Sequence, residues 1–325
     1  MIKVGIIGGS GYTSGELLRL LVNHPYADIK YVYSSSIPGK AVGAVHQDLE
    51  GQTDLKFTDT LSTEIDVLFL CMGHGMSRNF LTDIWTDKNV RVIDLSRDFR
   101  LKNDTALKGE NFVYGLPELN KEKIKAAKYI ANPGCFATAI ELGLLPLAHS
   151  GKLKNDVHVN AVTGATGAGA SVSGTSHFPW RDNNFSSYKP FTHQHLDEII
   201  ESVIQLQPGF GAQINFIPNR GNFSRGIFAT IYSEFNGSLE DAYAIYDDYY
   251  ADHLFTIVSK NDLHLKQVVN TNNCKIHLHK HENLLLISSA IDNLLKGASG
   301  QAVQNMNLMF DLNEEEGLRL KATYF

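Results

Sequence analysis

The chain has only three cysteines in 325 residues, widely spaced and odd in number. That count excludes a disulfide framework and favours a reducing compartment, for which the cytoplasm is the simplest expectation. No apolar run approaches the roughly 20 residues that a membrane helix requires, and the N-terminus lacks the pattern of a signal peptide. The net charge of −6 offers no basic surface for nucleic acid or anionic lipid. The sequence therefore argues against secreted disulfide-rich, membrane-spanning and nucleic-acid-binding classes.

Internal repeats, low-complexity tracts and long linkers are also missing, and 43% of the residues are hydrophobic and 20% charged. The length suffices for two domains, because single cores rarely grow beyond roughly 250–300 residues. Early in the chain, apolar segments alternate with helical periodicity such as that of Gly15–Asn23. We expect strands at Lys3–Ile7, Ile29–Tyr33, Asp66–Cys71 and Arg91–Leu95. Near-continuous apolar strands separated by helices predict a parallel sheet covered on both faces.

From about Asp156 the expected strands become longer, and strands and helices no longer alternate regularly along the chain. Predicted strands are Val157–Thr163, Gly226–Glu234, Lys275–His281 and Leu284–Ala290, and predicted helices are His195–Leu206, Leu239–Tyr250 and a final one at Gly297–Phe310. The last two strands are joined by a tight turn and should be antiparallel. The predicted fold is α/β, with an N-terminal Rossmann-type nucleotide-binding domain followed by an α+β catalytic and dimerisation domain.

A glycine-rich turn follows the first strand, in the segment GIIGGSGYTSGE at residues 5–16. Gly8, Gly11 and Gly15 allow a sharp turn and let backbone N–H groups approach a pyrophosphate at a helix N-terminus. The spacing departs from the strict G-x-G-x-x-G pattern, so the motif alone is weak. Its position between strand and helix favours dinucleotide binding, and a glycine-rich turn without a ligand is the alternative.

The end of the second strand lacks the carboxylate that usually binds the ribose 2′-hydroxyl of NAD. Ser34, Ser35 and Ser36 stand there instead, with Lys40 close behind. Hydroxyls and an ammonium can accept a 2′-phosphate, which a carboxylate would repel, so NADP is favoured over NAD. The alternative is that the serines only solvate a loop.

The segment NPGCFAT at residues 132–138 carries the predicted nucleophile. Pro133 and Gly134 turn the chain after a strand, and Cys135 stands at the start of a helix. The positive end of the helix dipole stabilises a thiolate and lowers a thiol pKa. A buried structural cysteine is the alternative, and it is the interpretation that we give to Cys71 and Cys274.

Thirteen histidines compete for the role of acid or base. His193 and His195 form an H-Q-H pair in a loop just before a helix, with Tyr188 and Lys189 upstream. A second group, His277, His279 and His281, alternates along one strand. Three ligands on adjacent rungs of one strand close a tetrahedral site poorly, so we predict a polar sheet face or subunit contact there and no metal.

These residues belong to longer segments that resemble the N-acetyl-γ-glutamyl-phosphate reductase family, the arginine-pathway branch of the aspartate-semialdehyde dehydrogenase-like group. The matching segments are GGSGYTSGELLRLL (8–21), DLSRDFRL (94–101), VYGLPELN (113–120), IANPGCFATAIELGLLP (130–146), SRGIFATIY (224–232) and SAIDNLLKGASGQAVQNMNLMF (289–310). YGLPE, NPGC-[FY]-x-T and the last segment are specific to that family, and their joint order covers nearly the whole chain.

The resemblance implies an oxidoreductase that reduces an N-acyl-γ-glutamyl phosphate, acetyl or succinyl, to the semialdehyde and phosphate with NADPH. It implies that Cys135 is the acyl-accepting nucleophile and His193 the acid or base; His195 is the alternative. Our hypothesis for the mechanism is a thioester on Cys135, with the imidazolium of His193 holding the thiolate and donating a proton. The resemblance further implies a homodimer or homotetramer and a discontinuous NADP-binding domain, residues 1–134 with 297–325, beside a catalytic and oligomerisation domain, 135–296.

The remaining site candidates fall into two groups. Candidates for substrate binding are Arg100, Tyr188, His195 and Arg225. Candidates for cofactor binding are Gly8, Ser10, Gly11, Tyr12, Thr13, Ser34, Ser36, Lys40 and Asn293, the last near the nicotinamide. The sequence departs from the family pattern at Gln194, where arginine or lysine is usual, and at Ser14, where glycine is common. Two rival functions stay open, an aspartate-semialdehyde dehydrogenase and a non-catalytic NADP-sensing protein.

Overall fold

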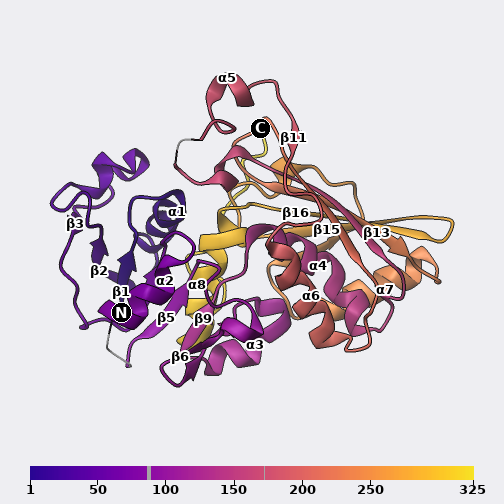
Figure 1. Ribbon diagram of the computed structural model, residues 1–325, viewed down its shortest axis with the longest axis horizontal. Helices are drawn as coiled ribbons and strands as arrows, with labels where there is room; N and C mark the ends of the chain where they lie inside the picture. Colours follow the sequence, from indigo (N-terminus) through magenta and orange to yellow (C-terminus); the bar gives the residue numbers. More distant parts are fainter. Residues whose placement is uncertain (86–88, 172) are drawn as a thin grey trace. The chain divides into compact units, whose positions relative to one another are not determined.

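The computed structural model describes residues 1–85, 89–171 and 173–325 (Figure 1). Contacts divide the chain into two compact units, a first unit of residues 1–133 and 298–319 and a second unit of residues 134–297 and 320–325. The C-terminal residues 320–325, expected in the nucleotide-binding domain, group with the second unit. There the backbone N–H of Thr323 donates to the carbonyl oxygen of Val269 at 3.1 Å.

The first unit is built on a seven-stranded sheet with the order β3-β2-β1-β4-β5-β9-β8. Its strands are β1 (Ile2–Ile7), β2 (Ala27–Tyr33), β3 (Phe57–Thr58), β4 (Val67–Leu70), β5 (Arg91–Asp94), β8 (Val113–Tyr114) and β9 (Tyr129–Ala131). All neighbouring pairs are parallel, so the predicted parallel sheet is confirmed. A separate two-stranded hairpin joins β6 (Ala106–Leu107) to β7 (Glu110–Asn111).

Four helices belong to this unit: α1 (Tyr12–Leu21), α2 (Met76–Asn79), α3 (Pro117–Ala126) and α8 (Gly300–Met309). Helix α1 buries Leu17, Leu18 and Leu21, which share one face at helical spacing. It begins at Tyr12, earlier than the predicted Gly15, because only its later residues carry the apolar periodicity. Helix α8 contacts α1, α3 and β5, so a segment near the C-terminus completes the N-terminal unit.

The second unit contains a mixed seven-stranded sheet with the order β11-β12-β10-β13-β16-β15-β14. Its strands are β10 (Val157–Thr163), β11 (Ser186–Ser187), β12 (Ile214–Arg220), β13 (Ile227–Glu234), β14 (Thr256–Ser259), β15 (Cys274–His281) and β16 (Leu284–Ile291). The β15–β16 hairpin is antiparallel, as predicted. Strands β10 and β12 are parallel, and so are β14 and β15.

Helices cover one face of this second sheet. They are α4 (Cys135–His149), α6 (His195–Leu206) and α7 (Leu239–Tyr249), with a short α5 (Phe178–Arg181) elsewhere. Helix α4 packs against β13, β15 and β16 and is buried over almost its whole length. Along β13, Ile227, Ala229 and Ile231 are buried, whereas the intervening residues are half-buried or exposed. Among the described residues no helix combines the length and hydrophobicity needed to cross a membrane.

Candidate active site

Cys135 is the first residue of α4; it is half-buried and takes part in no disulfide bond with the described residues. Gly134 precedes the helix in extended conformation, with φ −72° and ψ 149°. The first helical hydrogen bond runs from the N–H of Thr138 to the carbonyl of Gly134 at 2.8 Å. Because first-turn N–H groups have no helical acceptor, they direct positive potential toward the thiol. The setting predicted from the sequence for Cys135 is therefore present.

A second glycine lies directly against the nucleophile. A Cβ atom built on Gly297 would stand 2.8 Å from the Cβ of Cys135 and 3.3 Å from the carbonyl oxygen of Asp292. The N–H of Gly297 donates to that same carbonyl at 2.9 Å, which fixes the turn. Gly297 therefore allows a close approach to Cys135 that no other residue would permit. Periodicity could not reveal this packing, because the two residues are far apart in the chain.

Both predicted histidines lie against the residues that flank Cys135. The ring of His195 lies in contact with Gly134, at the place where a Cβ atom would be. The ring of His193 meets Phe136 edge to face at 5.5 Å between centroids, and it meets His195 at 4.6 Å. Both histidines are more than nine-tenths buried. The H-Q-H pair thus brings two imidazoles to the start of α4.

The protonation of His193 differs from the expected imidazolium. Burial, followed by the charges of Lys189 and Arg220, lowers the pKa of His193 to about 4. Its Nδ1 accepts the backbone N–H of His195 at 3.2 Å, so the proton of the neutral ring is on Nε2. A lowered pKa favours the neutral form of His193, a hydrogen-bond donor through Nε2, whereas the hypothesis drawn from the sequence has an imidazolium there; the role of His193 as acid or base stays a prediction.

Glu198 is a site residue that the sequence reasoning missed. Its Oε2 accepts the backbone N–H of Gly134 at 2.9 Å, and its Oε1 lies 4.0 Å from Nε2 of His195. The carboxylate is 96% buried, with a relative exposure of 4%. Its only sequence signal is the spacing His195-x-x-Glu198 in the first turn of α6, where i and i+3 side chains are neighbours. Glu198 therefore links the histidine pair to the turn that carries the nucleophile.

Tyr188 and Arg220 form the next layer of the site. The backbone N–H of Tyr188 donates to the carbonyl of Pro218 at 3.1 Å, and its ring lies 5.8 Å from that of His193. The guanidinium of Arg220 lies over the Tyr188 ring, 4.7 Å from its centroid. Burial and then the charge of Cys135 raise the pKa of Tyr188 to about 12. Tyr188 therefore stays protonated at neutral pH and lies within the electrostatic range of the nucleophile.

Arg225 and Asn293, two further candidates, are held by their own neighbours. Nε and Nη2 of Arg225 each donate to a different oxygen of Asp292 at 3.1 Å, and that carboxylate is fully buried. The side-chain oxygen of Asn293 accepts the N–H of Gly226 at 2.6 Å, and its amide donates to Thr166 at 3.1 Å. Substrate binding by Arg225 and a nicotinamide contact by Asn293 stay predictions.

In the first unit, the glycine turn has the features of a phosphate-binding turn. Gly8 has φ +83°, and a Cβ atom there would stand 2.7 Å from the carbonyl oxygen of Cys71. The N–H groups of Gly8 and Gly9 donate to the carbonyl of Tyr33, at 3.2 and 3.1 Å. Gly11 precedes α1, and around it the nearest atom to a built Cβ is 4.0 Å away. The turn therefore presents open backbone at a helix N-terminus, which fits a pyrophosphate.

The other cofactor candidates surround this turn. Ser10 and Tyr12 are exposed and Thr13 is half-buried at the start of α1. At the end of β2, the hydroxyls of Ser34 and Ser36 lie 3.2 Å apart, and Lys40 is exposed. Ser14 is buried, and its hydroxyl donates to the carbonyl of Gly11 at 2.8 Å. This serine therefore stabilises the turn rather than facing a phosphate.

His46 supports the same turn and was missed by the sequence reasoning. Its Nε2 lies 2.8 Å from the carbonyl oxygen of Gly9. A Cβ atom on Gly15 would come within 2.7 Å of its Nδ1. The histidine therefore spans the turn from Gly9 to the first turn of α1, and the small size of Gly15 makes room for it.

Arg100 lies in the first unit and is 6% exposed. Its Nε donates to the carbonyl of Asn132 at 2.9 Å and its Nη2 to the carbonyl of Leu95 at 3.0 Å. These bonds tie the ends of β5 and β9 together. Burial raises the pKa of the neighbouring Asp94 to about 6, against the effects of Ser77, Ser96 and Arg100. A role of Arg100 in substrate binding stays a prediction.

Cys71, Cys274 and His277 lie in structural settings. Burial and Asp94 raise the pKa of the Cys71 thiol far above its usual range, and Cys274 is buried beside the hydroxyl of Ser289 at 3.5 Å. His277 contacts the hydroxyl of Tyr243 at 3.1 Å and the carbonyl of Ser259 at 3.0 Å. Within residues 1–85, 89–171 and 173–325, no three His, Cys, Asp or Glu side chains are grouped as metal ligands would be.

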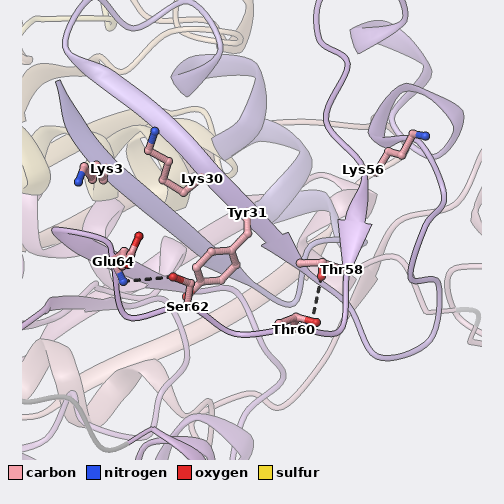
Figure 2. Close-up of a pocket in the computed structure, with 8 residues that line it drawn as sticks. All are labelled: Lys3, Lys30, Tyr31, Lys56, Thr58, Thr60, Ser62 and Glu64. Carbon is pink, nitrogen blue, oxygen red and sulfur yellow. Dashed lines mark hydrogen bonds between the residues drawn. The ribbon is translucent and has the colours of Figure 1, made fainter.

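A cavity of about 480 Å³ lies on the first unit, and none of these residues lines it (Figure 2). Lys3, Lys30 and Lys56 contribute to its wall together with Tyr31 and Glu64. The lining contains neither a cysteine nor a histidine. It therefore carries none of the predicted chemistry.

Two family models match the chain. The model described as the NAD binding domain of semialdehyde dehydrogenase matches residues 3–127, and the model described as the dimerisation domain of semialdehyde dehydrogenase matches residues 135–293. An N-acetyl-gamma-glutamyl-phosphate reductase of Christiangramia forsetii is 60% identical, and one of Flavobacterium johnsoniae is 55% identical. Each comparison covers 100% of both chains.

Solved structures resemble the fold at much lower identity. Aspartate semialdehyde dehydrogenase II of Vibrio cholerae has a TM-score of 0.76 at 15% identity, covering 96% of this chain and 98% of that one. The aspartate semialdehyde dehydrogenase of Candida albicans, solved with NADP, has a TM-score of 0.69 at 14% identity, covering 95% and 99%. At such identities the likeness establishes the architecture alone.

Proposed function

The chain belongs to the semialdehyde dehydrogenase family and groups with its N-acetyl-γ-glutamyl-phosphate reductases, and on that basis we propose that it reduces N-acetyl-γ-glutamyl phosphate. The products are N-acetylglutamate 5-semialdehyde and phosphate, a step of arginine biosynthesis. The observation that carries the proposal is 60% identity over the full length of a relative with that name, joined to Cys135 at the start of α4. Succinyl in place of acetyl is the alternative on the substrate nitrogen.

We propose NADPH as the reductant, held by the first unit. The left-handed Gly8 and the open backbone at Gly11 suit the pyrophosphate, with Ser10, Tyr12 and Thr13 beside it. Ser34, Ser36 and Lys40 suit the 2′-phosphate, because no carboxylate is present among residues 34–40 to repel it. When bound, NADPH supplies the hydride that reduces the acyl group. Asn293 would lie near its nicotinamide.

Covalent capture on Cys135 divides the reduction into two steps. The thiolate sulfur attacks the γ-carbonyl carbon, the bond from that carbon to the phosphate oxygen breaks, and phosphate leaves with the electron pair. This forms a thioester, which is more easily reduced than a carboxylate. After reduction the carbon–sulfur bond breaks, the aldehyde is released and the thiolate is restored. The N–H groups at the start of α4 stabilise the negative charge that develops on the carbonyl oxygen.

The two histidines divide the remaining tasks. His193 is neutral with its proton on Nε2, so it suits donation of a hydrogen bond to the developing oxyanion. His195 lies 4.0 Å from the carboxylate of Glu198, and its ring lies against Gly134, the residue before Cys135. We therefore assign to His195 the proton that leaves the Cys135 thiol. His193 as the acid or base, the assignment implied by the resemblance, is the alternative.

We also propose that the protein is a homo-oligomer of the cytoplasm. The match to a dimerisation domain over residues 135–293 supports a dimer, with a homotetramer as the alternative. The face of the second sheet that the helices leave uncovered exposes Tyr232 and half-exposes Phe228 and Leu286, which suits an isologous contact. A reducing compartment keeps Cys135 available as a thiol.

Parallel assays test the proposed function. NADPH oxidation is measured with N-acetyl- and with N-succinyl-γ-glutamyl phosphate, and the reverse reaction with N-acetylglutamate semialdehyde or aspartate semialdehyde in the presence of phosphate and NADP. We expect turnover with the acetylated substrates. Turnover confined to aspartate semialdehyde would favour the related dehydrogenase activity. NADPH binding without any turnover would favour a non-catalytic sensor.

A further inference from the structure

Two arginines of the second unit lie close in sequence but differ in how their charges are matched. Arg225 forms a bidentate ion pair with Asp292. Arg220, at the end of β12, has no carboxylate within ion-pairing distance among the described residues. Its Nε is buried and lacks a hydrogen-bond partner within that same described part of the chain. A half-buried cation without a counter-charge is costly, so Arg220 is a candidate for binding an anion.

The backbone of Arg220 is held firmly on both sides. It pairs with Thr163 of β10 and with Ser186 of β11, and its carbonyl accepts a hydrogen bond from Nη1 of Arg181 at 2.8 Å. The strand pairing therefore fixes the backbone position from which the guanidinium extends, so binding a ligand needs no ordering of the main chain.

The guanidinium also lies in the neighbourhood of the proposed nucleophile. It lies over the ring of Tyr188, 4.7 Å from the centroid. That ring is 5.8 Å from His193, whose own ring contacts Phe136, the residue after Cys135. These contacts all lie within the second unit.

We propose that Arg220 binds an oxyanion of the substrate, either the phosphate that leaves or the carboxylate on the α-carbon. The proposal rests on the function proposed above, because N-acetyl-γ-glutamyl phosphate carries both groups. The planar fork of arginine matches carboxylate and phosphate oxygens in pairs, which a single point charge does not. The bound oxyanion is the counter-charge of Arg220, in the way that the carboxylate of Asp292 is the counter-charge of Arg225.

The reverse reaction separates the two oxyanions, because phosphate and N-acetylglutamate semialdehyde are then different substrates with separate KM values. We expect Arg220→Gln to raise one of these KM values by about 10- to 100-fold, the range for a lost charge-assisted hydrogen bond. A rise in the KM of phosphate identifies the phosphate contact, and a rise in the KM of the semialdehyde identifies the carboxylate contact. Arg220→Lys, which keeps the charge without the fork, should recover part of the loss and serves if Arg220→Gln does not fold.

Lys266→Gln is the control for the loss of a positive charge, because Lys266 is exposed and is not among the charges that act on His193. It should leave both KM values within about twofold. KM values of Arg220→Gln within twofold of the wild type would overturn the proposal, and so would a Lys266→Gln variant with the same KM change. A wild type that is inactive on acylglutamyl phosphates would count against the proposed function. The role of Arg220 would still be decided by calorimetry, in which inorganic phosphate and N-acetylglutamate are titrated into the wild type and into Arg220→Gln.

Discussion

Close packing around single residues sets the position of the nucleophile. A methyl group at Gly297 would press on Cβ and Cα of Cys135, at 2.8 and 3.3 Å. We predict that Gly297→Ala lowers kcat by at least about 10-fold through this displacement and destabilises the fold by about 1–3 kcal/mol, as overpacking does. Gly209→Ala is the control, because nothing lies within 4 Å of its built Cβ. Steady-state kinetics and urea unfolding measure both effects; wild-type kcat in Gly297→Ala would refute the packing argument.

The low pKa of His193 predicts how activity and stability respond to acid. Since its pKa falls from the ordinary 6.5 to about 4, the unfolded chain binds a proton between these pH values that the folded chain does not. Stability from this group is therefore lost as the pH falls through that window. Protonation of Nδ1 would also break the bond from the His195 N–H. The acid limb of kcat/KM that belongs to His193 should accordingly lie below pH 6.

Lys189→Gln tests this cause directly. Removing the Lys189 charge, which helps lower the pKa of His193, should raise that pKa and move the acid limb to higher pH. Lys266→Gln removes an exposed charge that is not among those acting on His193 and should leave the limb in place. The pH dependence of kcat/KM for the three proteins is the measurement. An unchanged limb in Lys189→Gln would contradict the electrostatic explanation.

At this scale the sequence could predict residues whose function follows from local context. Cys135 is recognisable because a Pro-Gly turn places it at the start of a helix, and its setting was as expected. The bond from Arg225 to Asp292 and the contact of Gly297 with Cys135 could not be predicted, because they join segments distant in sequence. The lowered pKa of His193 could not be predicted either, since burial is a property of the folded chain.

At the scale of secondary-structure elements, the turn from β1 to α1 contains two glycines with different roles. One is needed for the backbone conformation and the other for the open space around it. Gly8 has φ +83° and no room for a Cβ, whereas Gly11 has φ −84° and open space around it. We predict that Gly8→Ala weakens both the fold and NADPH binding. Gly11→Ala should leave the unfolding free energy within about 0.5 kcal/mol and still raise the Kd of NADPH at least about 10-fold, because a methyl group would occupy the space meant for a phosphate.

Fluorescence titration with NADPH and thermal unfolding distinguish these two variants. Gly209→Ala is again the control, because nothing lies within 4 Å of a Cβ atom built on Gly209. Wild-type NADPH affinity in Gly11→Ala would show that the phosphate does not approach this residue.

Elements with strong periodicity were predicted well, and those with mixed signals were not. Strand β10 and helix α6 have the predicted ends, because clear alternation or an apolar stripe marks them. Strand β12 was missed, since Pro218 within it removes a backbone donor and weakens the strand signal. The final helix begins at Gly300 rather than Gly297, because a π-helical turn at Leu295–Ser299 precedes it, and hydrophobic spacing does not distinguish the two.

For the whole molecule, the chain passes between its two units next to residues of the site. One passage falls between residues 133 and 134, just before Cys135, and the other between residues 297 and 298, just after Gly297. The general two-domain plan was predictable from length and alternation. That residues 320–325 belong to the second unit was not predictable. The backbone hydrogen bond from Thr323 to Val269 joins distant segments and does not affect the hydrophobic pattern of the sequence around either residue.

The proposed dimer predicts a charge-sensitive sheet face. Tyr232, 42% exposed, stacks on His158 at 4.9 Å between centroids. Tyr232→Glu would place a carboxylate in the proposed interface beside its symmetry mate, and we expect the dimer dissociation constant to rise at least about 100-fold. Ala251→Glu, exposed after α7, is the control. Light scattering after size exclusion gives the mass; an unchanged oligomer in Tyr232→Glu would place the interface elsewhere.

The central claim is that the acyl group is transferred to the sulfur of Cys135 before it is reduced. Intact-protein mass spectrometry, after mixing enzyme with N-acetyl-γ-glutamyl phosphate in the absence of NADPH, tests it most directly. We predict one acyl adduct per chain, localised to Cys135 by peptide mapping, absent in Cys135→Ser and lost when NADPH is added. An adduct on Cys71 or Cys274, or undiminished NADPH-dependent turnover by Cys135→Ser, would contradict the account.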